Sequence, residues 1–175
     1  MRDLAVNDIL KSADNEHLYR VLWISDDRKA TYLFDMNTLE MPILTYYTEL
    51  QNKINDAEFE VQDKDPYLSI ICEEYLSDKD RKFRDERWNI ICDIVIDEPC
   101  ILNKHSRGKI VTETADRTGK TMYVIHRYLK AYWKYGKNKN AFLPNYQNCG
   151  GGGRERGANV HKRGRPRTNT VQAQA

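Results

Sequence analysis

Residues 104–136 read KHSRGKIVTETADRTGKTMYVIHRYLKAYWKYG, which is the pattern of two helices joined by a tight turn. Gly119 lies between them, and glycine readily adopts the left-handed conformation that ends many helices. The second helix is expected from about Thr121 to Tyr135. Residues at spacings of three and four mark the packed sides: Ile110, Val111, Thr114 and Ala115 in the first helix, and Ile125, Tyr128, Leu129 and Tyr132 in the second. We therefore predict a helix-turn-helix.

A third helix is predicted ahead of this pair. Within residues 80–96, Phe83, Trp88, Ile91 and Val95 repeat at helical spacing, and Pro99 ends the pattern. Two short helices bury little apolar surface by themselves, so a small helix-turn-helix domain needs this additional support.

The first 65 residues have the character of a small β-rich module. The stretches HLYRVLWIS (17–25) and ATYLFDM (30–36) are rich in aromatic and β-branched residues, and the polar SDDRK (25–29) between them predicts a hairpin. VNDIL (6–10) and FEVQD (59–63) are candidates for further strands. Pro42 precedes ILTYYTELQNKI (43–54), whose spacing predicts a helix packed on the strands.

Together these segments predict an α+β fold, with a small β-rich N-terminal module followed by a three-helix helix-turn-helix domain and a disordered basic tail. We expect the module with its one helix at 1–65, a connector at 66–79 and the helix-turn-helix domain at 80–148. Residues 149–175 form the Gly-rich and basic flexible tail, because that segment has almost no apolar content.

Charge divides the chain into two parts. Residues 1–100 contain 12 Lys and Arg against 23 Asp and Glu, a net charge of −11, whereas residues 101–175 contain 16 against 3, a net charge of +13. Neutralisation of phosphates by Lys and Arg dominates nucleic-acid affinity. The basic part therefore indicates a polyanion-binding region, and the acidic part alone would not bind DNA.

Enzyme and metal-site motifs are not apparent. Cys72, Cys92, Cys100 and Cys149 have no paired CxxC spacing, and the four histidines complete no zinc pattern. RTGKT (117–121) lacks the first glycine of a P-loop, since Thr114 occupies that position. We expect no cofactor in this chain. With no signal peptide or long apolar run, it is predicted to be a cytoplasmic protein without a membrane partner and without disulfides.

The tail contains a second candidate DNA-binding element. Arg163-Gly164-Arg165-Pro166 has the Arg-Gly-Arg-Pro core of an AT-hook, whose arginines lie along a narrow A·T minor groove. Four residues are equally consistent with a solvated basic linker or a localisation signal.

One order of motifs spans nearly the whole chain, from about Val6 to Arg167. It comprises Arg87-Trp88, then Tyr128-Leu129 through Tyr132-Trp133, Gly136, Asn140-Ala141-Phe142-Leu143-Pro144 with Tyr146, the glycines, Arg154, Arg156 and Lys162 to Pro166. In this order the chain resembles the amino-terminal region of a TnsB-type transposase. That family is the end-binding subunit of cut-and-paste transposons and is related to the Mu transposase and retroviral integrase superfamily.

The resemblance implies a bacterial, DNA-associated protein that binds double-stranded DNA sequence-specifically at repeated sites in transposon ends. In the family, a downstream ribonuclease-H-like domain with an Asp-Asp-Glu triad and two divalent metal ions performs strand transfer. This chain departs from the family by lacking that domain, so we expect no enzyme activity and no metal here. Other transposition proteins are expected to contact the missing C-terminal regions.

The predicted DNA-binding residues lie on the helix pair and in the tail. Those nearest base edges are Lys120, Thr121, Tyr123, Val124 and Arg127, with Arg127 the first choice for a bidentate guanine contact. Those expected mainly at phosphates are Lys104, Arg107, Lys130, Lys134 and Lys137. The tail would add Arg154, Arg156, Lys162, Arg163, Arg165 and Arg167.

Two other classes of protein remain open at this point. A stand-alone helix-turn-helix transcriptional regulator would use the same domain, but such regulators usually dimerise on palindromes, and the absence of a heptad or extended apolar face predicts a monomer. An interaction module would instead bind protein through its acidic first half.

Overall fold

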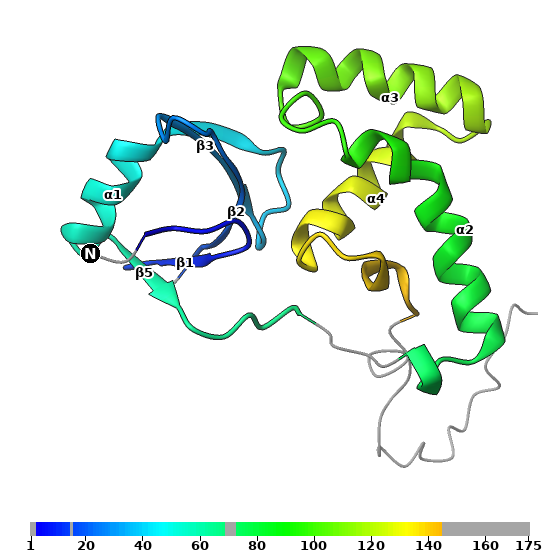
Figure 1. The fold of residues 1–175 in the computed structure, drawn as a ribbon, viewed down its shortest axis with the longest axis horizontal. Coiled ribbons are helices and arrows are strands. Elements are labelled where there is room, and N and C mark those ends of the chain that lie inside the picture. The colour runs from blue at the N-terminus through cyan, green and yellow to red at the C-terminus, as the bar shows by residue number, and fades with distance from the viewer. Residues whose placement is uncertain (1–2, 15, 69–72, 145–175) are drawn as a thin grey trace, which may run out of the picture. The chain divides into compact units, whose positions relative to one another are not determined.

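The computed structural model describes residues 3–14, 16–68 and 73–144. Five strands form one antiparallel sheet in the order β4-β3-β2-β1-β5 (Figure 1). Their bounds are β1 Ile9–Ser12, β2 Leu18–Ile24, β3 Ala30–Asp35, β4 Ile43–Tyr46 and β5 Phe59–Gln62. The predicted hairpin is confirmed, since β2 pairs directly with β3, and the two further strands are also present.

The helix predicted over residues 43–54 is wrong in its first turn. Ile43 to Tyr46 pair with Leu33 to Ala30 as the edge strand β4, and helix α1, Tyr47–Asn55, begins only afterwards. Backbone pairing to a neighbouring strand overrode the helical spacing, because Ile43 and Thr45 are β-branched residues that fit a pleated edge. Tyr47 and Leu50 carry the helical spacing into the core, and the partly buried Ile54 packs against them.

Apolar side chains are buried on both faces of the sheet. Val21 and Leu33 pack with Leu50 of α1 in one cluster. The opposite face contributes Leu22 and Phe34 to a second cluster that is shared with the helices. The pairing of β2 with β3 shifts in register between Val21 and Trp23, which marks a β-bulge or similar irregularity there. The sheet is therefore covered on both sides.

The three predicted helices are present with capped ends. They are α2 Asp78–Val95, α3 Lys104–Thr118 and α4 Met122–Lys134, together with the short 3-10 helices η1 Glu73–Tyr75 and η2 Lys139–Phe142. The side chain of Asn103 caps α3, and that of Thr121 caps α4. Gly119 ends α3 with a φ of 64°, in the left-handed region that the sequence predicted for it. The helix-turn-helix therefore forms from local signals.

A buried arginine ties the ends of the helical region together. Arg84 of α2 is 1% exposed, and its guanidinium donates to Glu73 of η1 at 2.6 Å, to Asp85 at 2.7 Å and to Asn140 of η2 at 3.0 Å. The adjacent guanidinium holds the pKa of the Glu73 carboxyl below its usual value. Because buried charges are costly unless paired, this set fixes η1 and η2 against α2.

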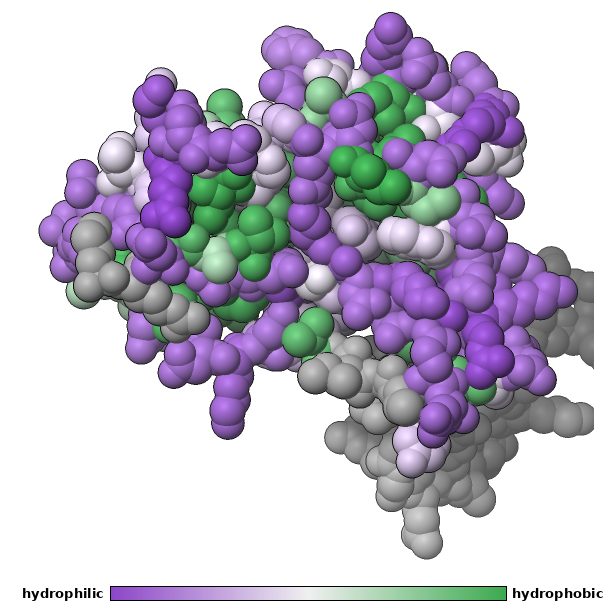
Figure 2. Space-filling view, in the orientation of Figure 1, coloured by the Kyte–Doolittle hydropathy of each residue, from purple (hydrophilic) through white to green (hydrophobic). Residues whose placement is uncertain are grey.

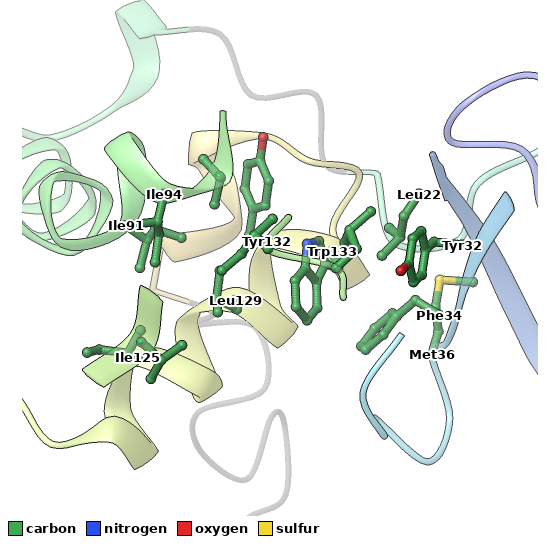
Figure 3. Packing of buried hydrophobic residues seen from close by; sticks show 14 of the residues in the cluster. Leu22, Tyr32, Phe34, Met36, Ile91, Ile94, Ile125, Leu129, Tyr132 and Trp133 are labelled. Carbon is green, nitrogen blue, oxygen red and sulfur yellow. The ribbon is translucent and has the colours of Figure 1, made fainter. Parts of the chain in front are cut away.

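The β-rich module also contacts the C-terminal end of α4. Trp133 is fully buried, and its ring lies 5.7 Å from that of Phe34 in β3 (Figure 3). Arg20 of β2 is also fully buried and donates to the Lys134 carbonyl at 2.8 Å and to Asp65 at 2.6 Å. A cation at this position suits the negative end of the helix dipole. The module therefore holds α4 at one end.

The α+β fold predicted from the sequence is confirmed for the described residues. Hydrophilic side chains cover most of the face seen in Figure 2. Among the helices in the described part of the chain, none has the length and apolar character that crossing a membrane requires.

Candidate nucleic-acid interface

The turn before α4 and the N-terminal half of that helix present an exposed cationic surface. Lys120 and Arg127 are exposed, and Tyr123 is 74% exposed. The Arg127 guanidinium lies 5.5 Å from the Tyr128 ring, which holds it against the helix without burying it. No acidic residue occurs between Asp116 and Glu155, so the sequence of this helix carries no charge that repels a phosphate. This face can approach an anionic polymer.

Two predicted contact residues, Thr121 and Val124, also have roles in the helix itself. The Thr121 hydroxyl accepts the Val124 backbone N–H at 3.4 Å and so caps the helix. Val124 is half-buried. Both lie in the first turn, where recognition helices usually touch bases, so they stay within the candidate surface.

The two predicted phosphate contacts on α3 differ in exposure. Lys104, in the first turn, is exposed. Arg107 is 5% exposed and donates to the Leu102 carbonyl at 2.7 Å, and its burial lowers the pKa of the guanidinium. A phosphate contact needs an exposed side chain, and the Arg107 side chain is buried. Helical spacing could have revealed this, because Arg107 precedes Val111 by four residues and Thr114 by seven and so lies on the same inward side.

Lys134 and Lys137 likewise make internal contacts. The Lys134 ammonium donates to the Met36 carbonyl at 2.9 Å and lies 4.4 Å from the Tyr67 ring. The Lys137 ammonium donates to the Leu22 carbonyl at 3.1 Å and to Glu98 at 2.6 Å, with only 16% of its side chain exposed. Both lysines were predicted to neutralise phosphates; in the structure their ammonium groups join the module to the helical region.

Lys130 and His126 continue the exposed stripe of α4. Both are half-buried and line a groove beside the helix. Burial lowers the pKa of His126 below its usual value, and the neighbouring Arg107 and Lys130 lower it further. His126 is therefore neutral near pH 7, and the positive charge in this part comes from Lys130 and Arg127.

Two family models match the chain. The TnsB N-terminal SH3-like domain matches residues 3–66, and the TnsB second domain matches residues 84–146. This chain is the N-terminal region of a TnsB-type transposase. The SH3-like domain contains all five strands and α1, and the second domain contains α3, α4 and α2 from Arg84 onward. No curated protein matched the chain.

The matched TnsB domains are of a DNA-binding type. The tail residues that were predicted to take part in DNA binding lie outside the described residues. These are Arg154, Arg156, Lys162, Arg163, Arg165 and Arg167. Within the described ranges, His, Cys, Asp and Glu side chains form no group of three or more that could hold a metal ion.

Reasoning from the TnsB-type sequence overlooked His126 and the loop at residues 36–42. His126 could have been found, because it lies three residues after Tyr123 and four before Lys130 on the same helical stripe. The loop could not, because about 80 residues of sequence separate it from α4 and no local pattern links the two.

Proposed function

We propose that this chain binds double-stranded DNA sequence-specifically at the ends of a transposon, as the N-terminal part of a TnsB-like transposase acting in DNA transposition. The observation that carries the proposal is the exposed cationic N-terminal half of α4 in a helix-turn-helix of this family. In that position Lys120, Tyr123 and Arg127 lie where a recognition helix reads the major groove.

Within this proposal the residues divide by role. Arg127 makes a bidentate contact to guanine, and Tyr123 offers an aromatic face to base edges or thymine methyl groups. Lys104, Lys120 and Lys130 neutralise phosphates, and the basic tail adds minor-groove contacts. Arg107, Lys134 and Lys137 are left out of the direct contacts because their side chains bond within the fold. Strand transfer is left to a catalytic domain that neither matched model describes.

The test is a fluorescence-anisotropy titration at several salt concentrations. One duplex is a sequence selected by the chain from a random library, and its shuffled version is the control. We expect the selected duplex to bind tighter by roughly a thousandfold, with affinity falling steeply as salt rises. Equal binding to both duplexes would reduce α4 to a nonspecific basic surface and would refute the proposal.

Two further points can be tested, one by the same titration and one by light scattering. We propose that binding needs no metal ion, so EDTA should leave the affinity unchanged. We also propose that the free chain is a monomer, which light scattering would measure. A tight dimer together with a palindromic selected site would favour a transcriptional regulator instead.

A further inference from the structure

The loop between β3 and β4 and the exposed stripe of α4 enclose a groove. Its volume is about 510 Å³, and its lining residues are Thr38, Leu39, Met41, Tyr123, His126, Arg127, Lys130, Ala131, Lys134 and Tyr135. Three of these come from the loop, residues 36–42, and the others from α4 and the residue after it. None of them is acidic, and three carry a permanent positive charge. The groove is therefore complementary to an anion.

The loop is held in shape by bonds of its own. The Asp35 carboxylate accepts the backbone N–H groups of Asn37 at 2.8 Å and Thr38 at 3.2 Å, and its other oxygen lies 2.7 Å from Nδ1 of His17. At the helix side, the Lys134 ammonium donates to the Met36 carbonyl. The wall that faces α4 is thus formed before any ligand binds, which lowers the entropic cost of binding.

Dimensions decide what a ligand in this groove would be. An α-helix with its side chains is about 10–12 Å across, and the major groove of B-DNA is about 12 Å wide. A helix that enters the major groove therefore fills it. Whatever stands beside the exposed stripe of such a helix must meet the sugar–phosphate strand at the groove edge.

We propose that the groove holds one sugar–phosphate strand of the bound duplex, between Lys130 of α4 on one side and the Thr38–Met41 segment of the loop on the other. This inference rests on the proposed function and deepens it, because it makes the SH3-like domain a direct DNA contact despite its acidic balance.

Glu40 provides the sharpest test, because it is exposed within the loop and its charge repels a phosphate. Glu40→Lys should raise affinity for the selected and the shuffled duplex alike, by roughly threefold to tenfold near 0.1 M salt, and should steepen the salt slope by about 1. Glu58→Lys is the matched control: Glu58 is exposed in the same domain, between α1 and β5, and the substitution changes the net charge equally. It should change affinity by less than about twofold, because charges beyond a Debye length of about 10 Å are screened.

A rescue experiment locates the strand. Lys130→Gln should weaken binding to both duplexes, and adding Glu40→Lys should restore most of the loss, because Glu40 lies between Leu39 and Met41, which line the same groove as Lys130. Adding Glu58→Lys should not. Rescue by both lysines alike would reflect net charge only and would overturn the groove.

Failure of the groove proposal and failure of the proposed function give different experimental results. If the wild-type chain binds the selected duplex and Glu40→Lys behaves like Glu58→Lys, the groove is refuted while the proposed function stands. If the wild-type chain does not prefer the selected duplex, the proposed function fails and the groove with it.

Discussion

Arg127 is the residue on which sequence discrimination should depend most. It is exposed on α4, and its guanidinium keeps its five N–H donors for a planar acceptor pair such as guanine O6 and N7. Arg127→Ala should cost about 1–3 kcal/mol on the selected duplex and relax preference at one base pair. Lys120→Ala is the control, because loss of a phosphate contact weakens all sequences alike. Anisotropy titrations on selected and shuffled duplexes decide between the two roles. Equal losses for Arg127→Ala on both would exclude base reading.

His17 makes the stability of the SH3-like domain dependent on pH. Its hydrogen bond to Asp35 raises the pKa of His17 above the usual 6.5. The pKa of Asp35 is below its usual value: burial raises it, but the N–H groups of Asn37 and Thr38 and the His17 ring together outweigh that effect. A raised histidine pKa contributes stability that is fully present below about pH 6.5 and is lost as pH rises through the folded-state value.

His17→Gln should therefore lower the free energy of unfolding more at about pH 5.5 than at about pH 8.5. Urea denaturation at the two pH values measures this. The control is His105→Gln, at an exposed position in the first turn of α3. A loss for His17→Gln that is the same at both pH values would show that the ion pair does not contribute.

At the scale of elements, alanine substitutions at two glycines, one inside α3 and one at its C-terminal cap, should change the free energy of unfolding in opposite directions. Gly119 ends α3 at a φ of 64°, where a Cβ is strained, so Gly119→Ala should destabilise the chain by about 1–2 kcal/mol. Gly108 lies within α3, and a Cβ there would meet nothing within 4 Å, so Gly108→Ala should stabilise by roughly 0.5–1 kcal/mol. Thermal or urea unfolding of both variants checks the pair. The same sign for both would mean that helix propensity, and not the turn, governs this segment.

Across the whole part of the chain that the structure describes, the buried guanidinium of Arg20 links the SH3-like domain to the TnsB second domain. Arg20→Met would leave Asp65 and the Lys134 carbonyl without their partner, so we expect a loss of about 3 kcal/mol in the free energy of unfolding. Arg28→Met is the matched control: Arg28 pairs with Asp3 at the surface, where such pairs contribute about 0–1 kcal/mol. Urea denaturation compares them. A loss for Arg20→Met no larger than that for Arg28→Met would show that this contact does not couple the domains.

Local patterns in the sequence predicted the helix-turn-helix correctly because its signals act within a few residues. Asn103, Gly119 and Thr121 cap or end helices through bonds to their own neighbours, and the packed side of α4 follows from helical spacing. The hairpin of β2 and β3 was predictable for the same reason, since a short polar turn joins its two strands. The family resemblance could also be found from the sequence, because it rests on the order of motifs along the chain.

Features that depend on contacts between distant parts of the sequence were decided only by the tertiary structure. Residues 43–46 became a strand because β3 offered a partner edge, and Lys134 and Lys137 turned inward because carbonyl groups of β2 and of the loop after β3 lay within reach of their ammonium groups. Such contacts join residues about 100 positions apart, so no periodicity records them. Sequence thus determined which side of α4 is cationic, whereas tertiary packing decided which of those cations stay free and set a loop of the SH3-like domain beside them.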